Sequence, residues 1–193
     1  MVVVVREAFG RKLEFEDIYN HLTLPDEVHL LKIGAGKEIV AMRGYSRRVL
    51  SGLQSLILEG AAILPEMQGN GVYGKMLEQA HEGESVLCLR TQNPRLYAAF
   101  EKFCDKVYPG FHDTPRAVRE IQKAFAEYLG CDADENGIVR EYYGGLFYGE
   151  EPYHERISPL FMERLKMDLH KGDAVLVLGV KEVEEHTCQP IEE

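Results

Sequence analysis

The stretch from Leu56 to Phe103 constrains the fold of this chain more than any other part of the sequence. An apolar, β-prone run leads through Pro65 into the glycine-rich turn QGNGVYG, which opens directly into an amphipathic helical pattern. A second strand pattern, SVLCLRT, and a second helical pattern that begins at Asn93 and Pro94 follow. Glycines at the start of a helix leave backbone N–H groups and the positive end of the helix dipole facing the same way, which creates an anion site. The sequence therefore predicts a phosphate-bearing ligand at this turn.

Gly69, Gly71 and Gly74 have the GxGxxG spacing of dinucleotide-binding folds, but their surroundings differ from those folds. There the strand ends immediately before the first glycine, and an acidic residue about 20 positions later binds the ribose. Here the residues PEMQ separate the strand from the glycine, and the next strand ends in LRT, without an acid. The sequence also lacks the Gly-Lys-Ser/Thr of a Walker-type loop. A nucleotide-dependent oxidoreductase is therefore the least favoured interpretation.

The remaining hydrophobic patterns indicate one α/β domain over residues 1–181, followed by an acidic tail at 182–193. Strands are predicted at residues 2–5, 28–33, 38–45, 53–64, 86–90 and 174–180, where β-branched and apolar residues gather. Helices are predicted at residues 15–22, directly after the glycine turn, and from Asn93 onward. Two more helices are predicted to begin at Thr114 and at Ser158, and the second of them stops at Gly172. Residues 108–154 form a long elaboration, and its part from Cys131 to His154 is predicted as loops with room for a short strand.

Composition narrows the class of partner. The formal net charge of −10 argues against nonspecific binding to nucleic acid or an anionic membrane, and it suits a cationic substrate such as an amine. No stretch is long enough to span a membrane, and the apolar N-terminus is too short for a signal peptide. The cysteines include no CxxC pair, which favours reduced thiols and a cytoplasmic protein.

The sequence offers no metal site. The histidines show no HxH or HExxH spacing. Asp132, Asp134 and Asn136 begin like a calcium loop, but its twelfth position is Tyr143 instead of the bidentate glutamate that such loops need. Asp, Asn and Gly are common in turns, so a polar turn explains these residues.

The string ILPEMQGNGVYGKML resembles the acyl-CoA-binding motif of the GNAT superfamily of N-acetyltransferases, V-x-P-x-x-R/Q-x-x-G-x-G/A followed by a helix. Ile63, Pro65, Gln68 and Gly71 stand at the matching positions. The next strand and the helix from Asn93 to FEKF resemble the family's following motif. The resemblance implies a mixed, mostly antiparallel α/β sheet flanked by helices, with a splayed pair of strands at the cofactor site. It also implies acetyl-CoA as cofactor and N-acyl transfer to a primary amine as activity.

The resemblance further assigns binding roles. Consecutive backbone N–H groups would wrap the cofactor pyrophosphate, by position those of Gly69, Asn70, Gly71, Val72, Tyr73 and Gly74. The strand is expected to splay from its neighbour after Ile63, so that main-chain groups of Ile63 and Leu64 pair with the pantetheine arm. A backbone N–H near Leu64 would stabilise the oxyanion of the reaction. Asn93 matches the family residue that contacts the pantetheine or anchors the opening.

Two residues depart from the family pattern. Tyr73 stands where the family has Gly or Ala, so its ring must either point away from the cofactor or narrow the phosphate pocket. Phe100 replaces the family's general-acid tyrosine, and phenylalanine cannot donate a proton to the leaving thiolate. Tyr97, about one turn earlier, substitutes only if the helix is shifted. A noncatalytic, regulatory CoA-binding module therefore stays open as an alternative.

Glu59 is the candidate general base, because an acid inside an apolar strand is costly to bury unless it is solvated or paired. Strand alternation would place Glu59, Ala61 and Ile63 on one face. The competing interpretation is a cleft carboxylate held in an ion pair.

The acceptor site is expected in the 108–154 elaboration, since substrate specificity tends to sit in such insertions. Aromatic residues there either line a substrate pocket or, as we favour, pack against the sheet: Tyr142, Tyr143, Phe147, Tyr148 and Tyr153. The acceptor is expected to be a small-molecule or peptide amine. A homodimer is open, because dimers are frequent in the family.

Overall fold

The computed structural model describes residues 1–36 and 38–181. Its strands are β1 (Glu27–Ile33), β2 (Glu38–Leu50), β3 (Leu53–Ile63), β4 (Val86–Thr91), β5 (Lys106–Tyr108), β6 (Ile138–Val139) and β7 (Ala174–Val180). Its helices are α1 (Val2–Phe9), α2 (Phe15–Thr23), the 3₁₀ turn η1 (Pro65–Met67), α3 (Val72–Ala80), α4 (Pro94–Glu101), α5 (Arg116–Tyr128), α6 (Ile157–Pro159) and the π turn η2 (Leu160–Arg164).

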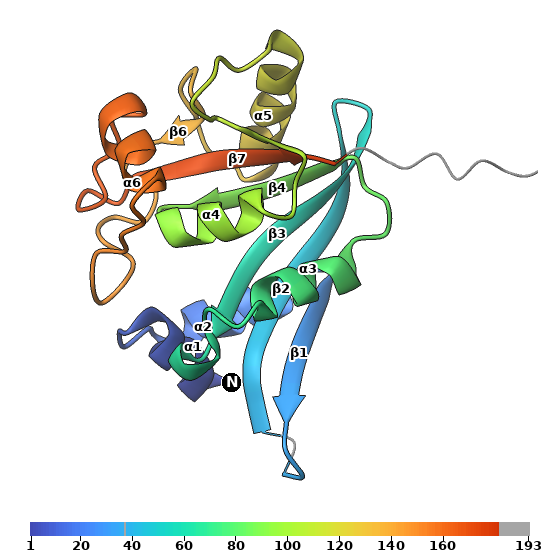
Figure 1. Cartoon of the computed structure of the whole chain (residues 1–193), viewed down its shortest axis with the longest axis vertical. Helices are drawn as coiled ribbons and strands as arrows, with labels where there is room; N and C mark the ends of the chain where they lie inside the picture. The colour runs from blue at the N-terminus through green and yellow to red at the C-terminus, as the bar shows by residue number, and fades with distance from the viewer. Residues whose placement is uncertain (37, 182–193) are drawn as a thin grey trace, which may run out of the picture.

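The strands form one sheet in the order β1-β2-β3-β4-β7-β5, and β6 pairs with β7 beyond the end of β5. Only the β3–β4 pair is parallel, and the other neighbours are antiparallel. This is the mixed, mostly antiparallel sheet that the family resemblance implied (Figure 1). The two parallel strands lie in the middle of the sheet, so their carboxyl ends meet at one edge, where the glycine turn and the start of α4 also lie.

Helices cover both faces of the sheet (Figure 1). One face packs against α3, α4 and η2 through a core that includes Leu77, Phe100 and Phe161. The other packs against α5 through Phe125 and against α1 and α2 through Ile18. Residues of β7 are buried on both faces, which explains why its sequence is an uninterrupted apolar run.

The N-terminal prediction was wrong, because residues 2–5 begin helix α1 instead of a strand. A short apolar run does not by itself distinguish strand from helix. Val4 and Val5 are buried, whereas Val3 is exposed. Burial of these two side chains against the second face decides the conformation over the β propensity of valine, and Gly10 at φ 63° ends the helix.

The helix predicted from Ser158 to Gly172 is shorter than expected. It ends with η2 at Arg164, and Lys166 takes a positive φ of 54°. The backbone N–H of Leu165 donates to the carbonyl of Leu160, the wide turn of a π-helix. Leu165 and Leu169 are still buried. The apolar spacing therefore predicted the burial of these residues correctly, but it did not predict where the helix ends. The acidic tail lies outside the described residues.

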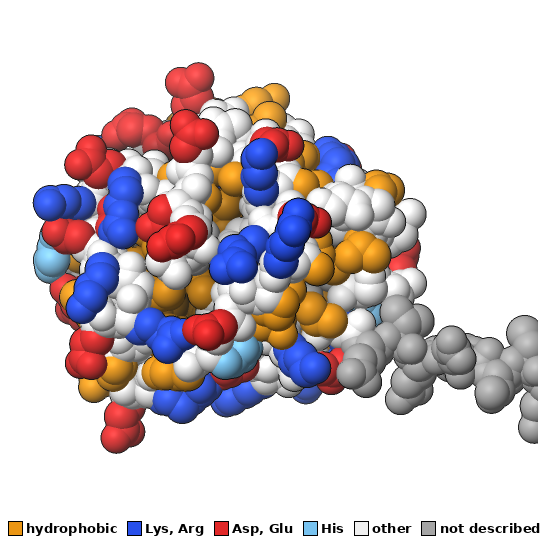
Figure 2. Space-filling model, turned by 90° about the horizontal axis from the view of Figure 1, so that it is seen from above, with side chains coloured by type: hydrophobic (Ala, Val, Ile, Leu, Met, Phe, Trp, Pro, Cys, Tyr) orange, Lys and Arg blue, Asp and Glu red, His pale blue; other side chains and the backbone are white. Residues whose placement is uncertain are grey.

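The upper side of the molecule in Figure 1 is seen directly in Figure 2, where acidic and basic side chains are interspersed. A search of the described helices finds none that is both long and apolar enough to cross a membrane.

Candidate functional site

Strands β3 and β4 separate partway along their length. Their parallel pairing runs from Ser55 and Val86 to Leu58 and Leu89 and stops there. The split therefore begins before Ile63, earlier than the sequence predicted. The cause is a β-bulge: Tyr45 pairs with Leu58 and Gly44 with Gly60, so Glu59 is an extra residue in β3. A bulge bends its strand and increases the local twist, which carries the rest of β3 away from β4.

The bulged strand aims main-chain groups into the split. The N–H of Leu64 donates to the carbonyl of Val40 at 3.0 Å, so Leu64 faces β2 and its N–H does not serve a ligand as predicted. Because antiparallel partners alternate, Ala61 and Ile63 direct their N–H and C=O groups the other way, toward the split. The Ile63 carbonyl accepts a hydrogen bond from Nε2 of Gln68 at 2.9 Å, which ties the following turn to the strand.

The glycine turn has the conformation that its sequence predicted. Gly69 and Gly71 have φ values of 77° and 74°, in the left-handed region that favours glycine. Nδ2 of Asn70 closes the turn by donating to the carbonyls of Glu66 and Gln68, each at 3.3 Å. Gly71 is the N-cap of α3. A Cβ added at Gly69 or Gly71 would meet open space, so the turn and the first N–H groups of α3 face a region that an anion can enter.

The side chains of the first three residues of α3 do not cover the glycine turn. Val72 and Tyr73 are buried, and a Cβ added at Gly74 would meet no neighbour. The Tyr73 ring points away from the turn into the core, which is the first of the two orientations expected for it. Its hydroxyl accepts a hydrogen bond from Nη2 of Arg43 at 2.8 Å, and burial raises its pKa.

Asn93 anchors the other side of the opening. Its side-chain oxygen accepts hydrogen bonds from the N–H groups of Arg95 and Leu96, at 2.9 and 3.4 Å, and so caps α4. Its own N–H donates to Oγ1 of Thr91 at 2.8 Å. Of the two roles that the resemblance implied for Asn93, these bonds support anchoring.

The structure does not bring Tyr97 to the split. Its buried hydroxyl donates to the carbonyl of Pro109 at 2.7 Å, and its ring packs edge-to-face on Phe161. Phe100 is also fully buried in this core. Leu96 of α4 lines the cleft, whereas Tyr97 and Phe100 do not. The proton donor expected on this helix is therefore missing at both positions.

A narrow cleft of about 50 Å³ occupies the split. It is lined by Phe9, Arg43, Leu58, Glu59, Gly60, Ala61, Leu89, Arg90, Thr91, Leu96, Tyr143, Phe147 and Tyr148. Three of the aromatic residues that we expected to pack against the sheet therefore also line this cleft, so packing alone does not describe them.

Glu59 lies on the α5 face of the cleft. Its Oε1 accepts a hydrogen bond from the hydroxyl of Tyr128 at 2.7 Å. The expected alternation is wrong, because the bulge reverses the faces: Ile63 lies on the α3 face, with Val72 and Met76. Glu59 is therefore neither an unpaired strand carboxylate nor half of a simple ion pair, because its carboxylate is hydrogen-bonded to a tyrosine hydroxyl.

Sequence reasoning did not single out Arg43 or Arg90, both of which line the cleft. Arg90 lies on the α5 side, with its guanidinium carbon 4.4 Å from the ring centre of Tyr142, to whose hydroxyl it donates. Arg43 lies on the α3 side. The rule that drew attention to Glu59, a charged residue inside an apolar strand, applies equally to Arg43 in IVAMRGYS and would have found it.

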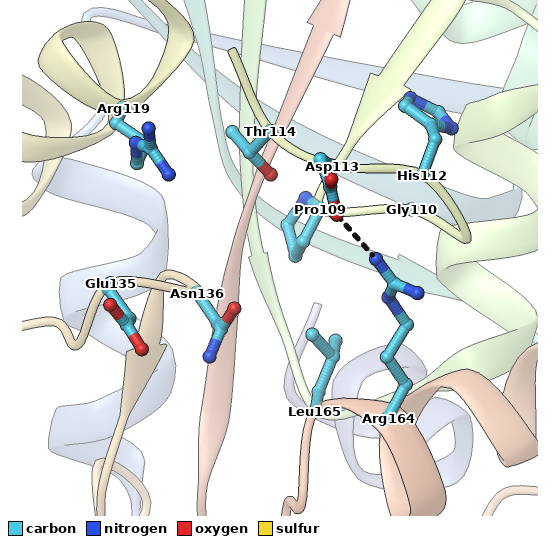
Figure 3. Close-up of a pocket in the computed structure, with 10 residues that line it drawn as sticks. All are labelled: Pro109, Gly110, His112, Asp113, Thr114, Arg119, Glu135, Asn136, Arg164 and Leu165. Carbon is cyan, nitrogen blue, oxygen red and sulfur yellow. Dashed lines mark hydrogen bonds and ion pairs between the residues drawn. The ribbon is translucent and has the colours of Figure 1, made fainter. Parts of the chain in front are cut away.

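A larger cavity of about 260 Å³ lies elsewhere, between the start of α5, the loop before β6 and η2 (Figure 3). Side chains of both signs surround it, and Asp113 pairs with Arg164 at 3.3 Å. Its charged residues, including Arg119 and Glu135, are exposed. An open cavity with exposed charges of mixed sign gives no specific chemistry.

No three His, Cys, Asp or Glu side chains within residues 1–36 and 38–181 are placed to hold a metal ion. The residues that imitate a calcium loop form a polar turn, in which Oδ1 of Asp134 accepts hydrogen bonds from the N–H groups of Asn136 and Ile138.

Comparison with solved structures identifies the fold. The chain is similar to an IAA acetyltransferase from Bacillus cereus, with a TM-score of 0.52 and 14% identity over 92% of this chain and 90% of that one. It is also similar to Chaetomium thermophilum Naa20 in complex with a bisubstrate analogue, with a TM-score of 0.51 and 12% identity over 100% of this chain and 87% of that one. No protein-family model and no curated protein matches the sequence. The chain has the fold of the GNAT N-acetyltransferases, as its motifs predicted.

Proposed function

We propose that this protein is an acyl-CoA-dependent N-acyltransferase, with acetyl-CoA as its simplest donor and a primary amine as acceptor. The observation that carries the proposal is the split between β3 and β4, which leads directly to the open glycine turn. A small-molecule or peptide acceptor, a cytoplasmic location and a homodimer belong to the same proposal.

The residues of the split fit coenzyme A. Gly69, Gly71 and the first N–H groups of α3 present donors and a positive helix end to a pyrophosphate. Ala61 and Ile63 direct main-chain groups into the split, where an amide-bearing pantetheine arm can pair with them as a strand would.

In the proposed reaction the acyl-CoA supplies a thioester, and a C–N bond to the amine forms as the C–S bond breaks. Glu59 takes the proton that the amine loses, directly or through water. Tyr148 takes the place of the missing tyrosine at Phe100 and returns a proton to the leaving sulfur. It lines the cleft, and its hydroxyl interacts with Asn93 and Thr91. A tyrosine hydroxyl carries its proton at neutral pH, and burial raises the pKa of Tyr148 further.

The test combines binding with turnover. CoA is expected to raise the Tm of the purified protein, and acetyl-CoA is expected to release free thiol in the presence of an accepted amine from a panel. A Tm shift without transfer to any amine would favour the noncatalytic CoA-binding module. A Tm shift with NAD(P) but not with CoA would contradict the proposal.

Gly71→Ala is expected to weaken CoA binding by about tenfold or more, because the new Cβ projects into the space where the phosphates would lie. It also strains the left-handed backbone by about 1–2 kcal/mol. Gly34→Ala is the matched control: Gly34 has φ 69° and open space around it, but it lies in the β1–β2 turn. Thermal shift with CoA should separate the two variants. Equal CoA affinity in both would remove the turn from the site.

Tyr97→Phe is expected to leave turnover unchanged while lowering stability by about 1–3 kcal/mol, since the buried Pro109 carbonyl loses its donor. Tyr148→Phe is the comparison, with turnover expected to fall. Urea denaturation and thiol release on both variants check this. A Tyr97→Phe enzyme that folds but no longer turns over would return Tyr97 to the mechanism.

A further inference from the structure

Arg43 is a buried cation for which the described residues provide no ion pair. Its residue is 2% exposed, on β2 opposite Ala61 of β3. Nη2 donates to the Tyr73 hydroxyl, but within the part of the chain that the structure describes Nε and Nη1 have no hydrogen-bond partner. An ionised group in the interior is costly unless it is paired, so this arrangement indicates that an anion completes the site.

Aromatic rings hold the guanidinium in place. Its carbon lies 4.0 Å from the ring centre of Tyr73 and 5.4 Å from that of Tyr45. The Tyr45 hydroxyl in turn donates to the carbonyl of Met76 at 2.8 Å, which fixes that ring against α3. Stacking positions the cation but does not supply acceptors for its remaining N–H groups. Arg43 lines the cleft between β3 and β4.

The place of Arg43 in the cleft indicates which part of a ligand it meets. A ligand with its phosphates at Gly71 and its arm along Ile63 and Ala61 ends near Leu58, where the strands rejoin. Arg43 flanks that end from the α3 side, whereas Glu59 lies on the α5 side, where Tyr128 contacts it. The cofactor's phosphates have open space at the glycine turn, whereas Arg43 lines the cleft between β3 and β4, so Arg43 meets a different part of the ligand.

We propose that Arg43 recognises a carboxylate on the acyl chain of the donor, so that this protein transfers a dicarboxylic acyl group such as succinyl. This rests on the proposed function and specifies its donor. The transfer balances as before: the amine nitrogen gains the succinyl group, the thioester C–S bond breaks, and the sulfur leaves as CoA thiol. A carboxylate on an amino-acid acceptor is the other source of the same chemistry, and the comparison of two acceptors in the test distinguishes the two sources.

The test measures binding apart from turnover. Calorimetric titration of CoA, acetyl-CoA and succinyl-CoA into the wild type is expected to show succinyl-CoA binding at least about tenfold tighter than acetyl-CoA. In Arg43→Met the preference should disappear, while the unliganded Tm is unchanged or raised because an unpaired buried charge is gone. Arg43→Lys should retain part of the preference. Arg116→Met, at an exposed position of α5, is the matched control and should retain all of it.

The outcomes are distinct. Equal binding of acetyl-CoA and succinyl-CoA to the wild type would overturn the assignment while leaving N-acyl transfer intact. Binding of no CoA derivative would instead contradict the proposed function itself. An Arg43→Met variant that loses Tm yet keeps the preference would show that Arg43 only supports the fold. Rates with glycine and with glycinamide as acceptors complete the test: a preference for glycine that Arg43→Met abolishes would move the carboxylate to the acceptor and overturn the acyl assignment.

Discussion

Glu59→Gln is expected to lower kcat with an accepted amine by about 100-fold, the lower end of what a positioned general base contributes. Glutamine keeps the size of the side chain and can still accept the hydrogen bond from the Tyr128 hydroxyl. It cannot take a proton from the amine. CoA affinity should not change, because the glycine turn lies at the far end of the split. Rapid thiol-release assays across pH, with calorimetric CoA binding, measure both expectations.

Two variants on α5 control this experiment. Tyr128→Phe removes the hydrogen bond but keeps the carboxylate, so turnover should fall far less than in Glu59→Gln. Glu120→Gln changes an exposed carboxylate that pairs with Arg116, and turnover should be that of the wild type. A Glu59→Gln enzyme with an unchanged kcat and pH–rate profile would remove Glu59 from the mechanism and leave the base to be sought among the cleft tyrosines.

The glycine turn could be predicted from the sequence because its conformation is local. Gly69 and Gly71 take left-handed backbone angles that few other residues tolerate, and Asn93 with Pro94 is a strong helix start. Each of these signals acts over a few neighbouring residues. The motifs that resemble those of the GNAT family are local too, and this resemblance implied the fold.

The geometry of the split could not be predicted in the same way. A bulge adds one residue to a strand without a distinctive sequence, and that residue, Glu59, reverses the faces of everything after it. Pairing between β2 and β3 decides where it falls. The N-terminal valines are a second case, since their helix depends on burial against residues far along the chain.

Tyr143, Phe147 and Tyr148 form the aromatic wall of the cleft. This wall depends on contacts between residues that are still farther apart in the sequence. The fully buried Gln92 accepts a hydrogen bond from the N–H of Phe147 at 2.6 Å through its Oε1. The N–H of Tyr143 donates to the carbonyl of Gly172, and that of Gly149 to the carbonyl of Phe9. These bonds join residues 143–149 to three other parts of the chain. Sequence reasoning placed the acceptor site in this elaboration, but only the folded chain shows which aromatic residues reach the cleft.

Asp173 is the charged residue that holds the base of this wall. It is 2% exposed, and its carboxylate accepts hydrogen bonds from Nη1 of Arg140 at 2.6 Å and from the N–H groups of Glu141 and Asp168 at 3.0 and 2.9 Å. Burial alone would raise its pKa, but the two N–H groups and Arg140 outweigh burial and lower it. The charged form is therefore the one that the folded chain stabilises.

Asp173→Asn is expected to reduce the free energy of unfolding at pH 7 by about 3 kcal/mol, the low end for breaking a buried charge pair because Arg140 is half-exposed. Since the pKa of Asp173 is lowered on folding, its contribution is complete above its unfolded pKa and disappears as pH falls through the folded one. The difference from the wild type should therefore shrink below about pH 4. Asp168→Asn, at an exposed end of the same loop, should cost less. Urea denaturation at pH 7 and in acid measures both.

Turnover of Asp173→Asn should fall as well, because Glu141 begins the segment that carries Tyr143 and Tyr148 to the cleft. An equal loss of stability at both pH values would mean that packing, and not the charge of Asp173, holds the wall in place.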